Sequence, residues 1–183
     1  MSDATKTTRF QGYQAGPASG ATLREEDGRW TLVFVRELKH APRKVWAALT
    51  EPANLRAWAP FDPDRNLGST GPAQLTMAGP EPQQFSAVVR RADEPTVLEY
   101  TWGGDVLRWQ LEEIVTGTRL TLYHTLEDRS WVSKVTAGWH ICIDVLERAL
   151  DGRPTGRIVA DDARLVGWER LNAEYSEQFG VAD

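Results

Sequence analysis

The 183-residue sequence contains a single cysteine, Cys142. One cysteine cannot form an intramolecular disulfide bond, and such sparse use is typical of proteins in a reducing cytoplasm. The sequence also lacks an apolar run of about 18 residues, the length needed to cross a bilayer. Its polar N-terminus has no signal-peptide pattern. We therefore expect a cytoplasmic protein that is not inserted in a membrane.

Basic residues are few and scattered. Lys and Arg total 21 against 26 Asp and Glu, which gives a formal net charge of -5, and no basic run is longer than a pair such as Arg90–Arg91. Nucleic-acid binding requires a cluster of cations that neutralises phosphates. The composition therefore predicts no nucleic-acid partner.

Motifs for a metal, a phosphate or a nucleophilic serine are also missing. His40, His124 and His140 do not have the spacing of zinc ligands, and Cys142 stands alone. The glycine-rich segments lack the lysine of a phosphate loop, and no nucleophile elbow of the Ser–His–Asp hydrolases occurs. We expect no metal, no cofactor and no assignable catalytic residue.

Tryptophan, in contrast, is abundant, with eight residues. Hydrophobic residues make up 41% and charged residues 26% of the sequence, which is ordinary for a globular protein. A length of 183 residues suits one domain with terminal extensions. Because tryptophan favours the walls of cavities and contact surfaces, we expect some of these residues to mark a functional site.

Hydrophobic alternation predicts a series of strands. A first strand is expected at residues 30–38, and short strands are expected around residues 65–69 and 73–78. Four further strands are separated by turns of Gly, Asp, Pro and Thr, as in an antiparallel meander. These four are residues 85–92, 96–102, 106–114 and 118–126.

Helical patterns lie on either side of these strands. Pro42 and Pro52 begin two short helices, and a long helix at 130–151 ends at Gly152 and Pro154. A final amphipathic helix is expected at 161–179. Because strands and helices are segregated, a doubly wound parallel fold is excluded and an α+β fold is predicted. A curved antiparallel sheet of about seven strands would wrap around the long helix.

Several short segments occur in the order seen in one known superfamily. They are FVRELKHAP at 34–42, VWAALT at 45–50, EPTVLEYTW at 94–102, GTRLTL at 117–122 and Gly138–Trp139. Over residues 30–152 the sequence thereby resembles the SRPBCC (START-like, birch-pollen-allergen-like) superfamily. Within it, the sequence is most similar to the branch related to the C-terminal domain of the heat-shock chaperone ATPase activator.

This resemblance implies the helix-grip fold and a hydrophobic pocket between the sheet and the long helix. It implies no common chemistry, because members include lipid carriers, hormone receptors, polyketide cyclases, oxygenase subunits and chaperone activators. We expect a mobile N-terminal arm at residues 1–28, a helix-grip domain at 29–153 and an amphipathic helical extension at 154–183.

The candidate ligand-binding residues are those predicted to face this pocket. They are Trp58, Trp102, Trp109, His124, Trp139, Arg36 and Tyr100. His124 shares a strand face with leucines and would be the main polar group of one cavity. Its alternatives are a core histidine with a protein partner, or a general acid or base. Arg36 has the alternative of a surface or salt-bridged guanidinium. His140 lies off the apolar stripe of its helix and is expected to be exposed.

Three functions are compatible with this pattern. The leading interpretation is non-enzymatic binding of a small hydrophobic or amphipathic molecule. The second is an interaction module that contacts a chaperone or another protein, and the third is a cyclase- or hydrolase-type enzyme. The stripe of the final helix, from Trp168 to Phe179, needs a surface to pack on. That surface is the domain itself, the pocket mouth or a second protomer, so a homodimer is one alternative.

Overall fold

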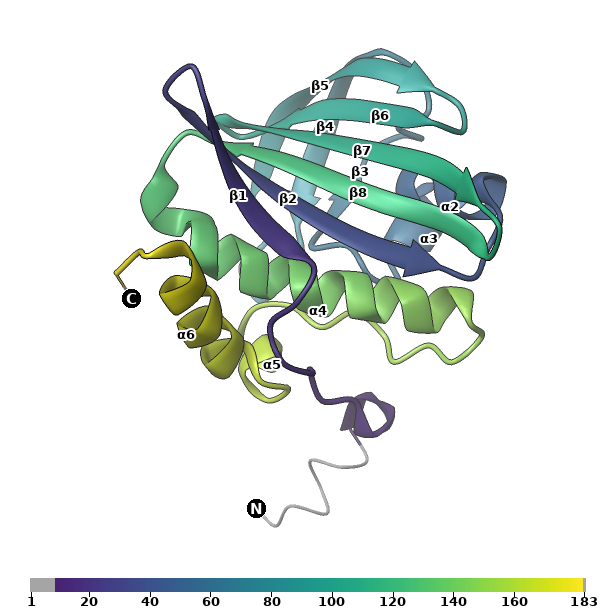
Figure 1. Ribbon diagram of the computed structural model, residues 1–183. Helices are drawn as coiled ribbons and strands as arrows, with labels where there is room; N and C mark the ends of the chain where they lie inside the picture. Colours follow the sequence, from purple (N-terminus) through teal and green to yellow (C-terminus); the bar gives the residue numbers. More distant parts are fainter. Residues whose placement is uncertain (1–8, 183) are drawn as a thin grey trace.

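The computed structural model describes residues 9–182. An eight-stranded antiparallel sheet curls around one long helix, α4, which crosses its open side (Figure 1). The strands are β1 (Ala21–Glu26), β2 (Arg29–Leu38), β3 (Phe61–Pro63), β4 (Gly71–Met77), β5 (Gln84–Asp93), β6 (Val97–Trp102), β7 (Asp105–Ile114) and β8 (Gly117–Leu126). Their order in the sheet is β1-β2-β8-β7-β6-β5-β4-β3. This arrangement is the α+β helix-grip fold that the sequence predicts.

The helices begin and end near the predicted signals. They are α2 (Pro42–Thr50), α3 (Pro52–Leu55), α4 (Val132–Leu150), α5 (Asp161–Arg164) and α6 (Trp168–Phe179), with short 3-10 helices η1 (Arg9–Gly12) and η2 (Arg129–Trp131). Pro42 and Pro52 occupy first-turn positions, where the missing N–H is not needed. Across residues 9–182, the helices all lack the combination of length and apolar character that crossing a membrane requires.

The register of β7 and β8 explains which side chains enter the core. Trp109 pairs with Leu122, and Leu107 pairs with His124, in an antiparallel ladder. Along β8 alternate residues are buried, from Thr118 to Leu126, because successive side chains of a strand point to opposite faces. The predicted pairing of these two strands is confirmed.

The strand count differs from the prediction because β1 lies within the segment expected to be an arm. Only Ala21 of β1 is buried, so its hydrophobic pattern is weak, and the strand is held by backbone pairing with β2. The sequence feature that could have predicted β1 is the Asp27–Gly28 pair, which favours a type I′ hairpin turn. In the structure both residues have the positive φ of such a turn. Residues 1–8 of the expected arm lie outside the described residues.

The strand expected at residues 65–69 is wrong. This segment is a loop that folds around the Arg65 guanidinium, which donates to the carbonyl oxygens of Asn66, Ser69 and Gly71. The short strand at this edge of the sheet is instead β3, which pairs with β4. A side chain that satisfies so many carbonyls of its own loop stabilises a turn instead of a strand.

The final helix is broken into α5 and α6. Gly167 adopts a φ of 108° at the break, a conformation that favours glycine. Leu171, Tyr175 and Phe179 of α6 are buried in contact with α4. The helix therefore packs on its own domain, which is one of the three surfaces that the sequence left open.

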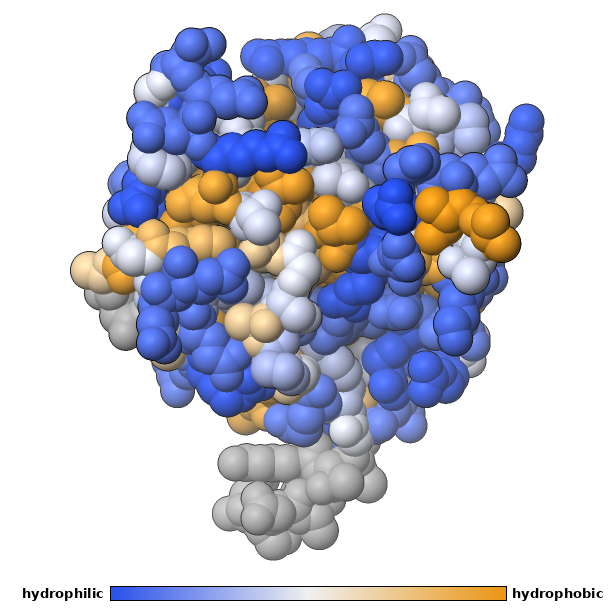
Figure 2. Space-filling view, viewed as in Figure 1, coloured by the Kyte–Doolittle hydropathy of each residue, from blue (hydrophilic) through white to orange (hydrophobic). Residues whose placement is uncertain are grey.

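The face drawn in Figure 2 is mostly hydrophilic, with a band of hydrophobic surface near β1 and β2. Among the described residues, the large hydrophobic side chains that are most exposed lie on separate elements. They are Val88, Val115, Trp131 and Leu165. Trp131, which is 55% exposed, lies beside the pocket described next.

Candidate functional site

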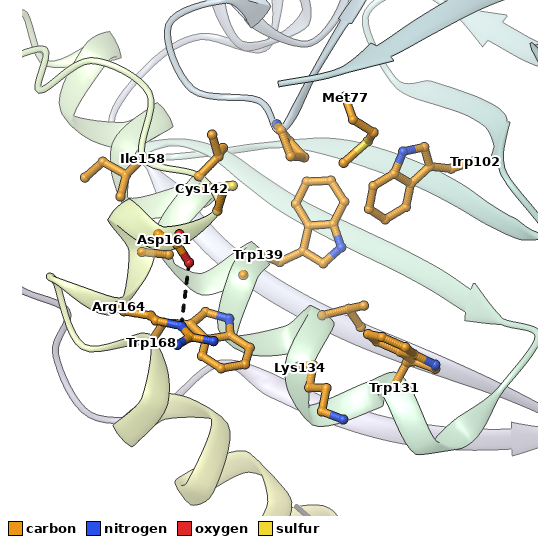
Figure 3. A pocket seen from close by; sticks show the side chains of 16 residues that line it. Met77, Trp102, Trp131, Lys134, Trp139, Cys142, Ile158, Asp161, Arg164 and Trp168 are labelled. Atoms are coloured by element: carbon orange, nitrogen blue, oxygen red, sulfur yellow. Dashed lines mark ion pairs between the residues drawn. The ribbon is translucent and has the colours of Figure 1, made fainter. Parts of the chain in front are cut away.

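A pocket of about 500 Å³ lies between α4, the β4 and β6 strands and the C-terminal segment (Figure 3). One wall is a single face of α4 together with its N-cap residue Trp131. Trp131, Val135, Gly138 and Cys142 follow one another at spacings of three and four residues. Met77 and Trp102 line the sheet side, and Ile158 and Trp168 line the C-terminal side. The wall is mostly apolar, with four tryptophans when Trp139 is included.

The link between α4 and α5 closes one side of this pocket. Arg157 donates from both terminal nitrogens to the carboxylate of Asp62 at 2.8 and 2.9 Å and also to the carbonyl of Phe61. Hydrogen bonding by Arg157 outweighs partial burial and lowers the pKa of Asp62. Ile158, the next residue, is buried in the pocket wall. The bidentate pair therefore holds the link against β3.

Among the lining residues that the structure describes, the charged ones lie at the rim of the pocket. They are Lys134, Asp161 and Arg164, and Arg164 approaches Asp161 at 4.0 Å (Figure 3). The ammonium group of Lys134 lies 5.0 Å from the centre of the Trp131 ring. Within residues 9–182 no group of three His, Cys, Asp or Glu side chains is arranged to hold a metal ion. An apolar wall with a charged rim suits an amphipathic molecule.

Of the seven candidate residues, only Trp102 and Trp139 line the pocket. Trp58, Trp109 and Tyr100 are buried in an aromatic cluster with Trp139. Ring centroids are 5.9 Å apart for Trp58 and Trp109 and 5.5 Å apart for Trp109 and Trp139. The expectation of one cavity lined by all of them is wrong, because these large rings fill the space between sheet and helix.

His124 is also buried behind the pocket wall. Its Nδ1 accepts from Trp139 Nε1 at 3.0 Å, and its Nε2 donates to the Asp105 carboxylate at 2.6 Å. Burial raises the pKa of Asp105, but hydrogen bonds from His124 and the Glu127 N–H outweigh it and lower the pKa. His124 is therefore a core histidine with protein partners on both nitrogens. It orients Trp139 and does not face the pocket.

Arg36 lies away from the pocket, in a network that the sequence did not reveal. Its guanidinium pairs with Asp144 at 2.7 Å and Glu147 at 2.8 Å. His140, expected to be exposed, is only 3% exposed, and its Nδ1 is 2.8 Å from the Tyr175 hydroxyl. The prediction for His140 is wrong because α6 covers this side of α4, and the pattern of α4 alone does not show that cover.

The free energy of unfolding is expected to depend on pH through His140. Burial lowers its pKa, Asp144 opposes this shift, and Arg36 and Arg170 add to it. The unfolded chain therefore binds more protons than the folded protein once the pH falls below about 6.5. Stability should decrease from that pH downwards, by up to about 1.4 kcal/mol per pH unit.

Urea unfolding at several values between pH 7.5 and 5.5 measures this slope. The His140→Gln variant serves as the control and should show a smaller loss over the same range. Equal slopes for the two proteins would contradict the assignment to His140.

A curved antiparallel sheet that grips a long helix beside an apolar pocket defines a helix-grip protein. A family model described as "Activator of Hsp90 ATPase homolog 1-like protein" matches residues 39–151. The chain belongs to this family, in agreement with the resemblance seen in the sequence. A search of curated protein sequences gave no match.

Solved structures share the fold. The conserved protein of unknown function EF2215 from Enterococcus faecalis is 18% identical, with a TM-score of 0.66 over 99% of this chain and 98% of that chain. CalU16 from Micromonospora echinospora is 20% identical, with a TM-score of 0.62 over 88% and 96%. An AHSA1-like protein from Aeromonas hydrophila is 19% identical, with a TM-score of 0.58 over 67% and 92%. At these identities the similarity supports the fold alone.

Proposed function

We propose that the protein binds a small hydrophobic or amphipathic molecule in the pocket beside α4, without catalysing a reaction. The observation that carries this proposal is a volume of about 500 Å³ with a mostly apolar wall and charges confined to the rim. Small-molecule sites have volumes of roughly this size and similar linings. Burial of apolar ligand surface would supply about 25 cal/mol for each Å² removed from water.

The titratable groups of the pocket support binding over acid–base chemistry. Burial raises the pKa of the Cys142 thiol to about 12, so the reactive thiolate is scarce near neutral pH. Asp161 is largely exposed and lies beside Arg164. A cyclase- or hydrolase-type reaction requires two titratable groups that converge on one substrate atom. Asp161 and Arg164 lie on the rim, away from the buried Cys142 thiol.

A charge placed in the apolar wall should weaken binding strongly. Val135 is half-buried on α4 and lines the pocket, so Val135→Asp would put a carboxylate where an apolar ligand lies. Titration with the fluorescent probe 8-anilinonaphthalene-1-sulfonate should show affinity reduced by at least about tenfold, which corresponds to ~1.4 kcal/mol.

The matched control is Val88→Asp, because Val88 is also a partly exposed valine but lies on β5 outside the pocket. That variant should bind the probe like the unmodified protein. Equal losses in both variants would contradict binding at this site. Native mass spectrometry of the purified protein tests the same proposal independently, through the mass of a retained small molecule.

A chaperone-activator-like interaction is the second candidate. The band of hydrophobic surface near β1 and β2 in Figure 2 is the feature that favours it, since exposed apolar surface marks contact sites in many proteins. The measurement is the ATPase rate of a purified Hsp90-type chaperone with and without this protein. A rate increase that persists in Val135→Asp would favour the interaction over ligand binding.

A further inference from the structure

Gly138 lies in the middle of α4 and in the wall of the pocket. Trp131, Val135 and Cys142, which share its helix face, line the pocket as well. Glycine in a helix interior is less favourable than alanine, because it loses more backbone entropy on folding. The residue at this position therefore weakens the helix.

Packing within the protein does not require a glycine at this position. Gly138 is not among the glycines with positive φ. A Cβ added to it would meet no heavy atom of the surrounding elements within 4 Å. The space that a side chain would occupy at residue 138 is therefore part of the pocket.

Four tryptophans from four elements line the same pocket as Gly138: Trp102 on β6, Trp131 on η2, Trp139 on α4 and Trp168 on α6 (Figure 3). The ring centroids of Trp102 and Trp139 are 5.6 Å apart, with planes inclined at 54°. Aromatic faces and edges gain specific contacts with another ring beyond the area that is buried. A flexible alkyl chain gains only the free energy of burying its apolar surface.

We propose that Gly138 determines the class of ligand: a flat, ring-containing molecule lies against the bare backbone of α4 at this residue, with its rings among the four tryptophans. This inference rests on the proposed binding function and specifies its ligand. A bulky side chain at residue 138 removes the space for the rings. It leaves the remaining pocket open to a narrower, flexible chain.

Two carboxylic acids test this proposal, anthracene-2-carboxylate as the ring probe and decanoate as the chain probe. Both carry the same charged group, so they differ in the apolar part. By calorimetry or tryptophan fluorescence, the unmodified protein should bind the ring probe at least about tenfold more tightly. Gly138→Leu should reduce ring-probe affinity by about tenfold or more and change decanoate affinity by less than about threefold.

Gly138→Ala is the second variant and guards against a folding defect. Its melting temperature should equal or exceed that of the unmodified protein, since alanine favours the helix, while its ring-probe affinity falls by a smaller factor. Equal affinity for both probes, or parallel losses in Gly138→Leu, would overturn the ring preference and leave the binding function standing. If neither probe binds the unmodified protein, the proposed function fails and the inference fails with it.

Discussion

Replacing Asp144 by asparagine is expected to lower the free energy of unfolding by about 3 kcal/mol. The Asp144 carboxylate lies 2.7 Å from Arg36 and accepts a hydrogen bond from the Tyr13 hydroxyl at 2.5 Å. Burial and this carboxylate raise the pKa of Tyr13, so the hydroxyl stays protonated and donates. Removing the charge leaves a mostly buried guanidinium with Glu147 as its remaining ion-pair partner among residues 9–182, and such a loss is costly in a low-dielectric environment.

Calorimetry should show a melting temperature lower by roughly 6–12 °C, given about 2–4 °C per kcal/mol for a chain of this length. Glu112→Gln is the matched control, because Glu112 pairs with Arg119 on the exposed surface. A surface pair contributes at most about 1 kcal/mol. Similar losses in the two variants would show that the buried network does not stabilise the fold.

Truncation after Pro154 is expected to cause the largest loss of stability. It removes Leu171, Tyr175 and Phe179, which are all buried. Burial of one such side chain stabilises a protein by about 1.5–3 kcal/mol, so the three together match a large part of the ~5–15 kcal/mol that holds a domain folded. It also removes Arg157 and leaves Asp62 without its ion-pair partner.

Thermal unfolding and limited proteolysis of the truncated chain measure this effect. Truncation after Gly180 is the control, since it removes only three residues and leaves α6 intact. A truncated chain with an unchanged melting curve would show that α6 is not part of the cooperative unit. Leu171→Ala is a milder change at the same contact, and it is expected to lower the free energy of unfolding by about 2–5 kcal/mol.

The pH, pocket and ligand experiments address separate parts of the molecule. His140 reports the contact between α4 and α6, Val135 reports the pocket wall, and Gly138 reports the shape of the ligand. The His140 result is therefore independent of the other two, whereas the Gly138 result depends on binding in the pocket that Val135 lines.

Local sequence signals predicted the elements that depend on near neighbours. The alternation along β8 placed His124 on the buried face, and the long helix ends before Gly152, which has a φ of 75°. Such features follow from backbone geometry and from the side-chain periods of strand and helix. The order of these elements, together with short motifs, was enough to predict the helix-grip fold and its family.

Local signals failed where a distant segment supplies the partner. His140 was expected to be exposed because its partner Tyr175, on α6, is 35 residues away in sequence. Arg36 was a candidate pocket residue, and the structure shows its salt-bridged alternative because Asp144 and Glu147 lie on α4, more than 100 residues away in sequence. β1 has a weak hydrophobic pattern because only Ala21 of the strand is buried, and its position in the sheet depends on its partner β2. Periodicity within one element does not show which segment will cover it.

The sequence by itself determined strands β2 and β4 to β8, most helix boundaries, the antiparallel meander and the face of the sheet on which His124 lies. Only the tertiary structure decided which tryptophans line the pocket. Trp102 and Trp139 do so, whereas Trp58 and Trp109 fill the interior. The reason is that periodicity sets the direction of a side chain, but the distance between facing elements sets whether a ring fills a core or borders a cavity.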